Sequence, residues 1–202
     1  MDKPTRSAHA QLWGLEQGRV FLNHGSFGAT PMAVREEQRT WQDLMENEPV
    51  RFFEDLMPNI LQATRKHLAA FLSCDPDDLA LVENATSGVN TVLRSLQFAP
   101  GDEILVPDHA YQACRNTIDF VAQRWGAKVI TVNIPFPISD PQEALDAIMD
   151  GVSTRTRLAM IDTVTSPTGL LMPFERLVPM LEERGVEVLL DAAHGIGMIP
   201  LN

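Results

Sequence analysis

The chain has 202 residues, of which 45% are hydrophobic, and a formal net charge of -11 at neutral pH. This length accommodates one large domain or two small ones, and the apolar content is sufficient for a packed core. The negative charge disfavours a nucleic acid or an anionic membrane as a partner, because both repel an acidic protein. The composition therefore indicates a soluble protein, and we expect it to be cytoplasmic.

The N-terminus and the two cysteines give no targeting or metal signal. Met1 begins a polar stretch that leads into no long apolar segment, so we expect no signal peptide. No run reaches the ~20 apolar residues that a membrane span requires. Cys74 and Cys114 are far apart and lack metal-ligand spacing, so each is better explained as an apolar side chain.

The first third of the chain is predicted to form an arm, a loop and two helices. An irregular arm carries one amphipathic turn around Leu12, and the apolar residues 20–22 precede a loop at 23–28 that contains two glycines. Helices are expected at 31–44 and 52–72. Pro58 either kinks the second helix or marks its true start.

From Leu79 onward, short apolar runs alternate with longer amphipathic segments. This alternation is typical of parallel strands that are connected by helices. The predicted fold class is therefore α/β, with a mostly parallel sheet and flanking helices. We expect strands at 79–82, 104–106, 128–132, 158–161 and 186–190, and helices at 87–97, 111–125, 141–149 and 173–184.

Asp191 ends the last apolar run and is followed by Ala-Ala-His194-Gly195. A carboxylate in this position lies at the carboxyl edge of the sheet, where open α/β sheets bind their ligands. It could simply cap the next turn. Alternatively, it could pair with a pyridine nitrogen and keep that nitrogen protonated, because an ion pair favours the charged form.

A second element, Asn84-Ala-Thr86-Ser-Gly88, opens a predicted helix after an earlier apolar run. The free N–H groups of a helix N-terminus bind phosphate, although Asn, Thr and Ser are also the residues that cap helices. The segment lacks the glycine spacing of a dinucleotide site and the Gly-Lys-Ser/Thr of a P-loop. An anion site together with Asp191 suits pyridoxal 5′-phosphate (PLP), whose protonated ring is an electron sink.

Three further groups follow strands at the same expected edge. Tyr111, in His109-Ala-Tyr111, could stack on a flat cofactor or pack in the core. Ser166 lies in Thr-Ser166-Pro-Thr-Gly169, which could also be an ordinary turn. His194 could contact a cofactor oxygen or satisfy a backbone carbonyl. Each group alone is weak evidence, but their shared position strengthens the PLP hypothesis.

With these motifs, the chain resembles the N-terminal half of a class V aminotransferase-type, fold-type I PLP enzyme, closest to the isopenicillin N epimerase-like branch. The resemblance begins near Phe21 and runs to the last residue. It is carried by Phe21-Leu-Asn-His-Gly-Ser-Phe-Gly28, Asn84-Ala-Thr-Ser-Gly88, Asp108-His-Ala-Tyr111, Ser166-Pro-Thr-Gly169 and Asp191-Ala-Ala-His194-Gly195.

The resemblance implies a role for each matching residue. Asp191 and His194 are the implied catalytic residues: Asp191 pairs with the ring nitrogen and His194 contacts the phenolic oxygen. The resemblance implies phosphate binding by Ala85, Thr86 and Ser87, ring stacking by Tyr111, a contact to the ring oxygen from Ser166, and substrate contacts from Asn23, His24, Ser26 and Arg51. Residues 1–30 are then an arm and substrate loop, and residues 31–202 an incomplete PLP-binding large domain.

The chain departs from the family pattern in its lysines. The family's Schiff-base lysine lies beyond the strand that follows the Asp motif, and the sequence ends before that position. The three lysines present, Lys3, Lys66 and Lys128, match no part of the motif. We therefore expect a truncated chain that lacks the Schiff-base lysine and the small C-terminal domain.

The resemblance implies that the complete protein acts at the α carbon of an amino acid, as an epimerase or an aminotransferase, and forms a homodimer. A cysteine desulfurase or C-S lyase is the alternative reaction. Two other hypotheses stay open: a catalytically incompetent fragment or split gene product, and a nucleotide-binding domain without PLP. The missing glycine fingerprint counts against the nucleotide-binding domain.

Overall fold

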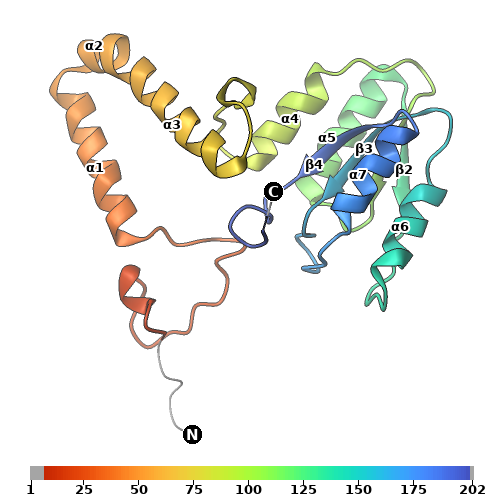
Figure 1. Cartoon of the computed structure of the whole chain (residues 1–202), viewed down its shortest axis with the longest axis horizontal. Helices are drawn as coiled ribbons and strands as arrows, with labels where there is room; N and C mark the ends of the chain where they lie inside the picture. The colour runs from red at the N-terminus through yellow and green to blue at the C-terminus, as the bar shows by residue number, and fades with distance from the viewer. Residues whose placement is uncertain (1–6, 201–202) are drawn as a thin grey trace, which may run out of the picture. The chain divides into compact units, whose positions relative to one another are not determined.

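The computed structural model describes residues 7–200 (Figure 1). Contacts between Cα atoms divide the chain into two units, Met1–Ala80 and Leu81–Asn202, each of which is considered by itself. Across residues 7–200, every helix is too short or too polar to cross a membrane.

The first unit is helical, as predicted. The 3₁₀ turn η1 (Ala10–Leu12) precedes the long helix α1 (Met32–Asn47) and the short helix α2 (Pro49–Arg51). A π-helical turn, η2 (Phe52–Leu56), leads into α3 (Met57–Leu72), and η3 (Pro76–Asp78) closes the unit. Pro58 lies in the first turn of α3, directly after the π-helical turn η2, so the helical backbone continues across it from Pro49 to Leu72. Pro58 therefore does not mark the start of the helix; it lies where π-helical hydrogen bonding gives way to α-helical hydrogen bonding.

The second unit contains a four-stranded parallel sheet with the strand order β2-β1-β3-β4. Helices alternate with the strands along the chain (Figure 1). The predicted α/β fold class is confirmed. The strands are β1 (Glu103–Pro107), β2 (Lys128–Val132), β3 (Thr156–Asp162) and β4 (Glu187–Asp191), and the helices are α4 (Ala85–Ser95), α5 (Gln112–Trp125), α6 (Pro141–Asp150) and α7 (Phe174–Glu183).

The strand predicted at 79–82 is wrong. These residues adopt no regular structure, and the side chains of Leu81 and Val82 are about half exposed. A strand needs a neighbour that accepts and donates its backbone hydrogen bonds. In the described part of the chain, the edge strands β2 and β4 pair with β1 and β3, respectively, and neither pairs with residues 79–82. An apolar run alone therefore did not suffice to form a strand.

Alternating side chains of the strands build two apolar cores, one on each face of the sheet. Ile104 and Met160 point to the face that α4 and α5 cover, whereas Leu105 and Ile161 point to the face that α6 and α7 cover. Successive strand residues point to opposite faces. Asp162, two residues after Met160, and Asp191, two residues after Leu189, therefore lie on the face of α4 and α5.

Glu103 anchors the amino edge of the sheet. Its side chain is 6% exposed and pairs with the guanidinium of Arg155 at 3.1 Å. The hydroxyl groups of Ser153 and Thr156 also donate to its carboxylate. The hydrogen bond from Ser153 and the charge of Arg155 lower the pKa of Glu103, although burial opposes them.

Candidate active site

Asp191 is a buried carboxylate at the end of β4, with a side chain that is 6% exposed. Its Oδ1 accepts a hydrogen bond from the N–H of Ala193 at 3.0 Å, and its Oδ2 lies 3.7 Å from the sulfur of Cys114 on α5. Among residues 7–200, no lysine, arginine or histidine side chain forms an ion pair with it. The negative charge of Asp191 is therefore available to a cationic ligand.

The turn after β4 holds Asp191 in place and requires a glycine. The N–H of Thr163 donates to the carbonyl of Asp191 at 2.9 Å, and the N–H of Gly195 donates to the carbonyl of Ala192 at 2.8 Å. A Cβ at position 195 would lie 2.8 Å from Oγ1 of Thr163. Only glycine lets this turn pack so closely against β3. His194 lies in the same turn and is half-buried.

The first turn of α4 is capped by Asn84, and its first two amides remain free of the cap. Oδ1 of Asn84 accepts a hydrogen bond from the N–H of Ser87 at 2.8 Å, so Asn84 is a true N-cap. The cap leaves the N–H groups of Ala85 and Thr86 available, because the first amides of a helix have no intrahelical acceptor. Helix α4 packs against β4, so both candidate binding elements belong to one cluster (Figure 1).

Tyr111 and Ser166 are both accessible to a ligand. Tyr111 directly precedes α5 and is 44% exposed, so its ring is not part of either core. Ser166 is exposed in the loop after β3. His109, to which the sequence analysis gave no role, joins the two loops: its Nδ1 lies 3.0 Å from Oγ1 of Thr168, which in turn lies 2.7 Å from Oγ1 of Thr165.

Asp162 is a second buried carboxyl group that the sequence analysis missed. It is 3% exposed and is the register partner of Asp191 in the pairing of β3 with β4. Burial, reinforced by the charge of Asp191, raises the pKa of Asp162 to about 7. The available signal was its position directly after the apolar run 158–161, the same signal that identified Asp191.

The four residues expected to face the substrate belong to the first unit. Asn23, His24 and Ser26 lie in an exposed loop, where Nδ1 of His24 accepts a hydrogen bond from the N–H of Ala29 at 3.3 Å. The ring of His24 meets that of Phe21 edge-to-face, with centroids 4.7 Å apart. Arg51 ends α2 and is exposed. The roles of these four residues stay predictions.

Neither lysine in the described part of the chain lies in this cluster. Lys128 begins β2, so it is at the amino edge of the sheet, whereas Asp191 is at the carboxyl edge. Lys66 is exposed on α3 in the first unit, and Lys3 lies outside the described residues. Among residues 81–200, the carboxyl edge of the sheet around Asp191 therefore carries no lysine amine.

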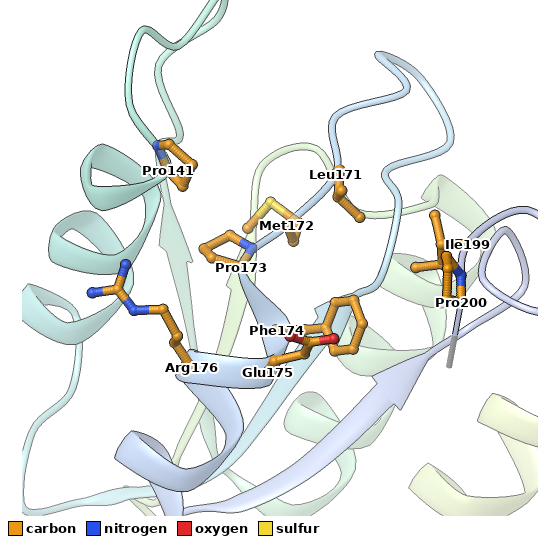
Figure 2. A pocket seen from close by; sticks show the side chains of 9 residues that line it. All are labelled: Pro141, Leu171, Met172, Pro173, Phe174, Glu175, Arg176, Ile199 and Pro200. Carbon is orange, nitrogen blue, oxygen red and sulfur yellow. The ribbon is translucent and has the colours of Figure 1, made fainter. Parts of the chain in front are cut away.

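A separate cavity of about 380 Å³ is lined in part by the first turns of α6 and α7 (Figure 2). It is mostly apolar, and of its two charged residues, Glu175 and Arg176, the arginine donates a hydrogen bond to the side chain of Gln142 at 2.8 Å. None of the residues predicted to bind PLP lines it. Its lining consists of Pro141, Leu171, Met172, Pro173, Phe174, Glu175, Arg176, Ile199 and Pro200.

The chemistry of the cluster around Asp191 fits PLP. Free N–H groups at the start of α4 suit a phosphate, the exposed ring of Tyr111 suits a flat heterocycle, and the buried charge of Asp191 suits a protonated ring nitrogen. All three features belong to the second unit of the chain.

Comparison with known proteins also points to a PLP-dependent family. The family model for Aminotransferase class-V matches residues 32–202. Putative L-cysteine desulfhydrase 2 of Oryza sativa subsp. japonica is 33% identical over 197 residues, which are 90% of this chain and 41% of that protein. Isopenicillin N epimerase of Streptomyces clavuligerus is 34% identical over 183 residues, which are 91% of this chain and 46% of that protein.

Solved structures share the fold. A mutant of C-DES with glycine covalently linked to the PLP cofactor has a TM-score of 0.83 and 24% identity, over 92% of this chain and 50% of that chain. This chain thus spans about half the length, or less, of the proteins that it matches. Class V aminotransferases use PLP, which agrees with the predicted cofactor. The match over residues 32–202 confirms the predicted resemblance: the chain belongs to the class V aminotransferase family.

Proposed function

We propose that this chain forms the cofactor-binding part of a PLP-dependent enzyme that breaks a bond to the α carbon of an amino acid. The proposal rests on the environment of the Asp191 side chain. It is buried and oriented by the N–H of Ala193, and none of the described residues pairs with it as a cation. A buried carboxylate of this kind stabilises a cationic ring above it.

Each residue of the cluster then has a defined task. Asp191 keeps the ring nitrogen protonated, and the N–H groups of Ala85 and Thr86 bind the phosphate. Tyr111 covers one face of the ring, while Ser166 and His194 approach its oxygen substituent. PLP itself supplies an electron sink for the bond broken at the α carbon. Lys128, the one lysine among residues 81–200, lies at the opposite edge of the sheet from Asp191, so we propose that another lysine supplies the amine that links PLP to the protein.

The shared step of the candidate reactions is the loss of the α proton. Epimerisation returns the proton, transamination returns it elsewhere, and elimination expels a group from the β carbon. Relatives named isopenicillin N epimerase and L-cysteine desulfhydrase are almost equally similar to this chain, at 34% and 33% identity. We therefore propose α-proton removal as the function, with epimerisation or transamination as its outcome.

Cleavage of a C–S bond is the second candidate. Four relatives named L-cysteine desulfhydrase, from Oryza sativa and Arabidopsis thaliana, are 31–33% identical to this chain. A hercynylcysteine sulfoxide lyase of Schizosaccharomyces pombe is 25% identical. These names support a sulfur-containing amino acid as a substrate class to be tested beside the others.

We also propose that the complete protein is a homodimer in which the loop at residues 23–28 helps to build the substrate site. Support comes from large apolar side chains that are exposed on and beside this loop: Val20 is 68% exposed, Leu22 88% and Phe27 79%. Neighbouring exposed apolar side chains of this size are typical of a surface that another chain covers. Sedimentation at micromolar concentration tests the dimer, and an active monomer would refute it.

The activity test uses a polypeptide that contains residues 1–202 together with the PLP-linking lysine. Incubation of single amino acids in deuterated buffer should exchange the α proton, which NMR detects directly. Interconversion of enantiomers then indicates an epimerase, an oxo acid indicates a transaminase, and sulfide with pyruvate from cysteine indicates elimination. A PLP-loaded protein that exchanges no α proton in a full amino-acid panel would contradict the proposal.

A further inference from the structure

Asp162 is a buried carboxyl group with an unmet hydrogen bond. The residue is 3% exposed at the end of β3, and its Oδ2 has no hydrogen-bond partner among residues 7–200. Most buried polar side-chain atoms in proteins have a partner, so an unpartnered oxygen at a ligand-binding edge is informative. The roles proposed above for the cofactor contacts make no use of Asp162.

The sheet places Asp162 beside the residue that meets the ring nitrogen. Asp162 and Asp191 are register partners on neighbouring parallel strands, and alternation directs both side chains to the face of α4 and α5. The carbonyl of Asp191 accepts hydrogen bonds from the N–H of Thr163 at 2.9 Å and, more weakly, from its Oγ1 at 3.4 Å. The backbone of Thr163, the first residue after β3, is thus hydrogen-bonded to Asp191.

The ionisable groups that face Asp162 are all acidic. Asp191 faces it from β4 and Cys114 from α5, and the first turns of α4 contribute no ionisable side chain. Within residues 7–200, no cation pairs with either aspartate. Two adjacent buried carboxylates cannot both be ionised without a large desolvation and repulsion penalty. Burial and the charge of Asp191 accordingly raise the pKa of Asp162 to about 7.

We propose that Asp162 is the second carboxyl group of the ring-nitrogen site, which holds a proton while the site contains no cation and releases that proton to solvent when a pyridinium ring pairs with Asp191. The incoming positive charge offsets one negative charge, which allows the second carboxyl group to ionise. Asp162 thereby couples PLP binding to proton release. The inference holds for any of the reactions considered above, because it concerns the cofactor and not the substrate.

Infrared spectroscopy tests the proposal on the wild-type chain without any activity measurement. A protonated carboxylic acid has a carbonyl stretching band that an ionised carboxylate lacks. At pH 6 the chain without PLP should show this band with the intensity of about one carboxylic acid, that of Asp162, because the exposed acids are ionised at this pH. The band should disappear above pH 8, and also at pH 6 once absorbance shows that PLP is saturating. Absence of the band at pH 6, or its persistence with PLP bound, would overturn the proposal.

Matched variants assign the band and count the proton. Asp162→Asn should lack the band, whereas Asp119→Asn, at an exposed position of α5, should keep it. Calorimetric titration with PLP at pH 6, in two buffers that differ in ionisation enthalpy, should show wild type releasing close to one proton more than Asp162→Asn. Equal proton release would overturn the proposal, since the phosphate of PLP contributes equally in both proteins. If the chain binds no PLP, the proton-release step is overturned, and the result also counts against the proposed PLP site. The infrared band at pH 6 without PLP tests the protonation of Asp162 independently of that outcome.

Discussion

The sulfur of Cys114 lies 3.7 Å from Oδ2 of Asp191, so the first turn of α5 touches the carboxylate that ends β4. Cys114 is 1% exposed and belongs to the core beneath that face of the sheet. The thiol is a weak hydrogen-bond donor. Asp191 therefore meets the apolar core of this face at Cys114, while its Oδ1 accepts a hydrogen bond from the N–H of Ala193.

The two cysteines should differ sharply in reactivity. Burial, with the charge of Asp191 adding to it, raises the pKa of Cys114 to about 12, so almost no thiolate forms at neutral pH. Cys74 is exposed. A chromogenic thiol reagent at pH 8 should titrate one cysteine quickly and the second only after unfolding. Cys74→Ser should remove the fast phase, and a fast phase that survives in this variant would contradict the buried position of Cys114.

Asp191→Asn should strongly slow α-proton exchange while it preserves the fold. The amide has the size of the carboxylate but cannot keep a ring nitrogen protonated. Loss of one partner of a buried charge pair costs about 2–5 kcal/mol, which corresponds to a rate loss of roughly 30- to 4,000-fold. The test needs the lysine-bearing polypeptide and compares α-proton exchange with the thermal midpoint. Unchanged exchange in a PLP-saturated Asp191→Asn protein would refute the assignment.

The chain without PLP should lose stability as the pH rises from about 4 to about 7. The folded pKa of Asp162, about 7, exceeds its ordinary value of 3.8, so the folded state binds the proton more tightly than the unfolded state. This contribution is complete below pH 4, declines through pH 7 and amounts to a few kcal/mol, on the order of 1.4 kcal/mol per pKa unit.

Urea unfolding at several pH values checks this prediction, and the difference between wild type and Asp162→Asn isolates the contribution of Asp162. The comparison is necessary because Glu103, whose pKa is lowered, contributes with the opposite sign at acidic pH. If the free energy of unfolding of Asp162→Asn follows the same pH slope as wild type, the buried carboxyl group is not the cause.

Substitutions in the first turn of α4 should separate capping from phosphate binding. Asn84→Ala removes the cap and should lower the free energy of unfolding by about 0.5–2 kcal/mol. Thr86→Val keeps the cap, and should change stability by less than about 0.5 kcal/mol but weaken PLP binding roughly 5- to 10-fold through the lost hydroxyl. Absorbance titration with PLP and thermal unfolding measure the two effects. Unaltered PLP affinity in Thr86→Val would refute a phosphate contact from the hydroxyl group of Thr86.

Two acid–arginine pairs in the sheet should differ in their contribution to stability. Glu103 is buried and bonded to Arg155, Ser153 and Thr156, so Glu103→Gln should cost about 1–3 kcal/mol. Glu187 and Arg157 are both more than half exposed and 3.8 Å apart, so Glu187→Gln should cost less than about 1 kcal/mol. Urea unfolding at pH 7 provides both values, and equal losses would show that the bonds to Glu103 are not formed in solution.

The sequence by itself determined the elements and the family. The strand at 128–132 has the predicted bounds, and the apolar run before Asp191 placed that carboxylate correctly at the end of a strand. Both succeed because hydrophobic periodicity and the residues at strand ends are local properties of the chain. The motifs around Thr86, Tyr111 and Asp191 identified the class V family for the same reason, since short segments carry them.

Only the tertiary structure decided which of these elements are neighbours. Residues 79–82 are apolar enough for a strand, yet no described strand pairs with them. Asp162 and Asp191 are 29 positions apart and become a pair solely through the order and register of β3 and β4. Both carboxyl groups are buried, but their hydrogen bonds differ: Oδ1 of Asp191 accepts one from the N–H of Ala193, whereas Oδ2 of Asp162 has no partner among the described residues. Strand order and register depend on long-range pairing, which no local pattern encodes.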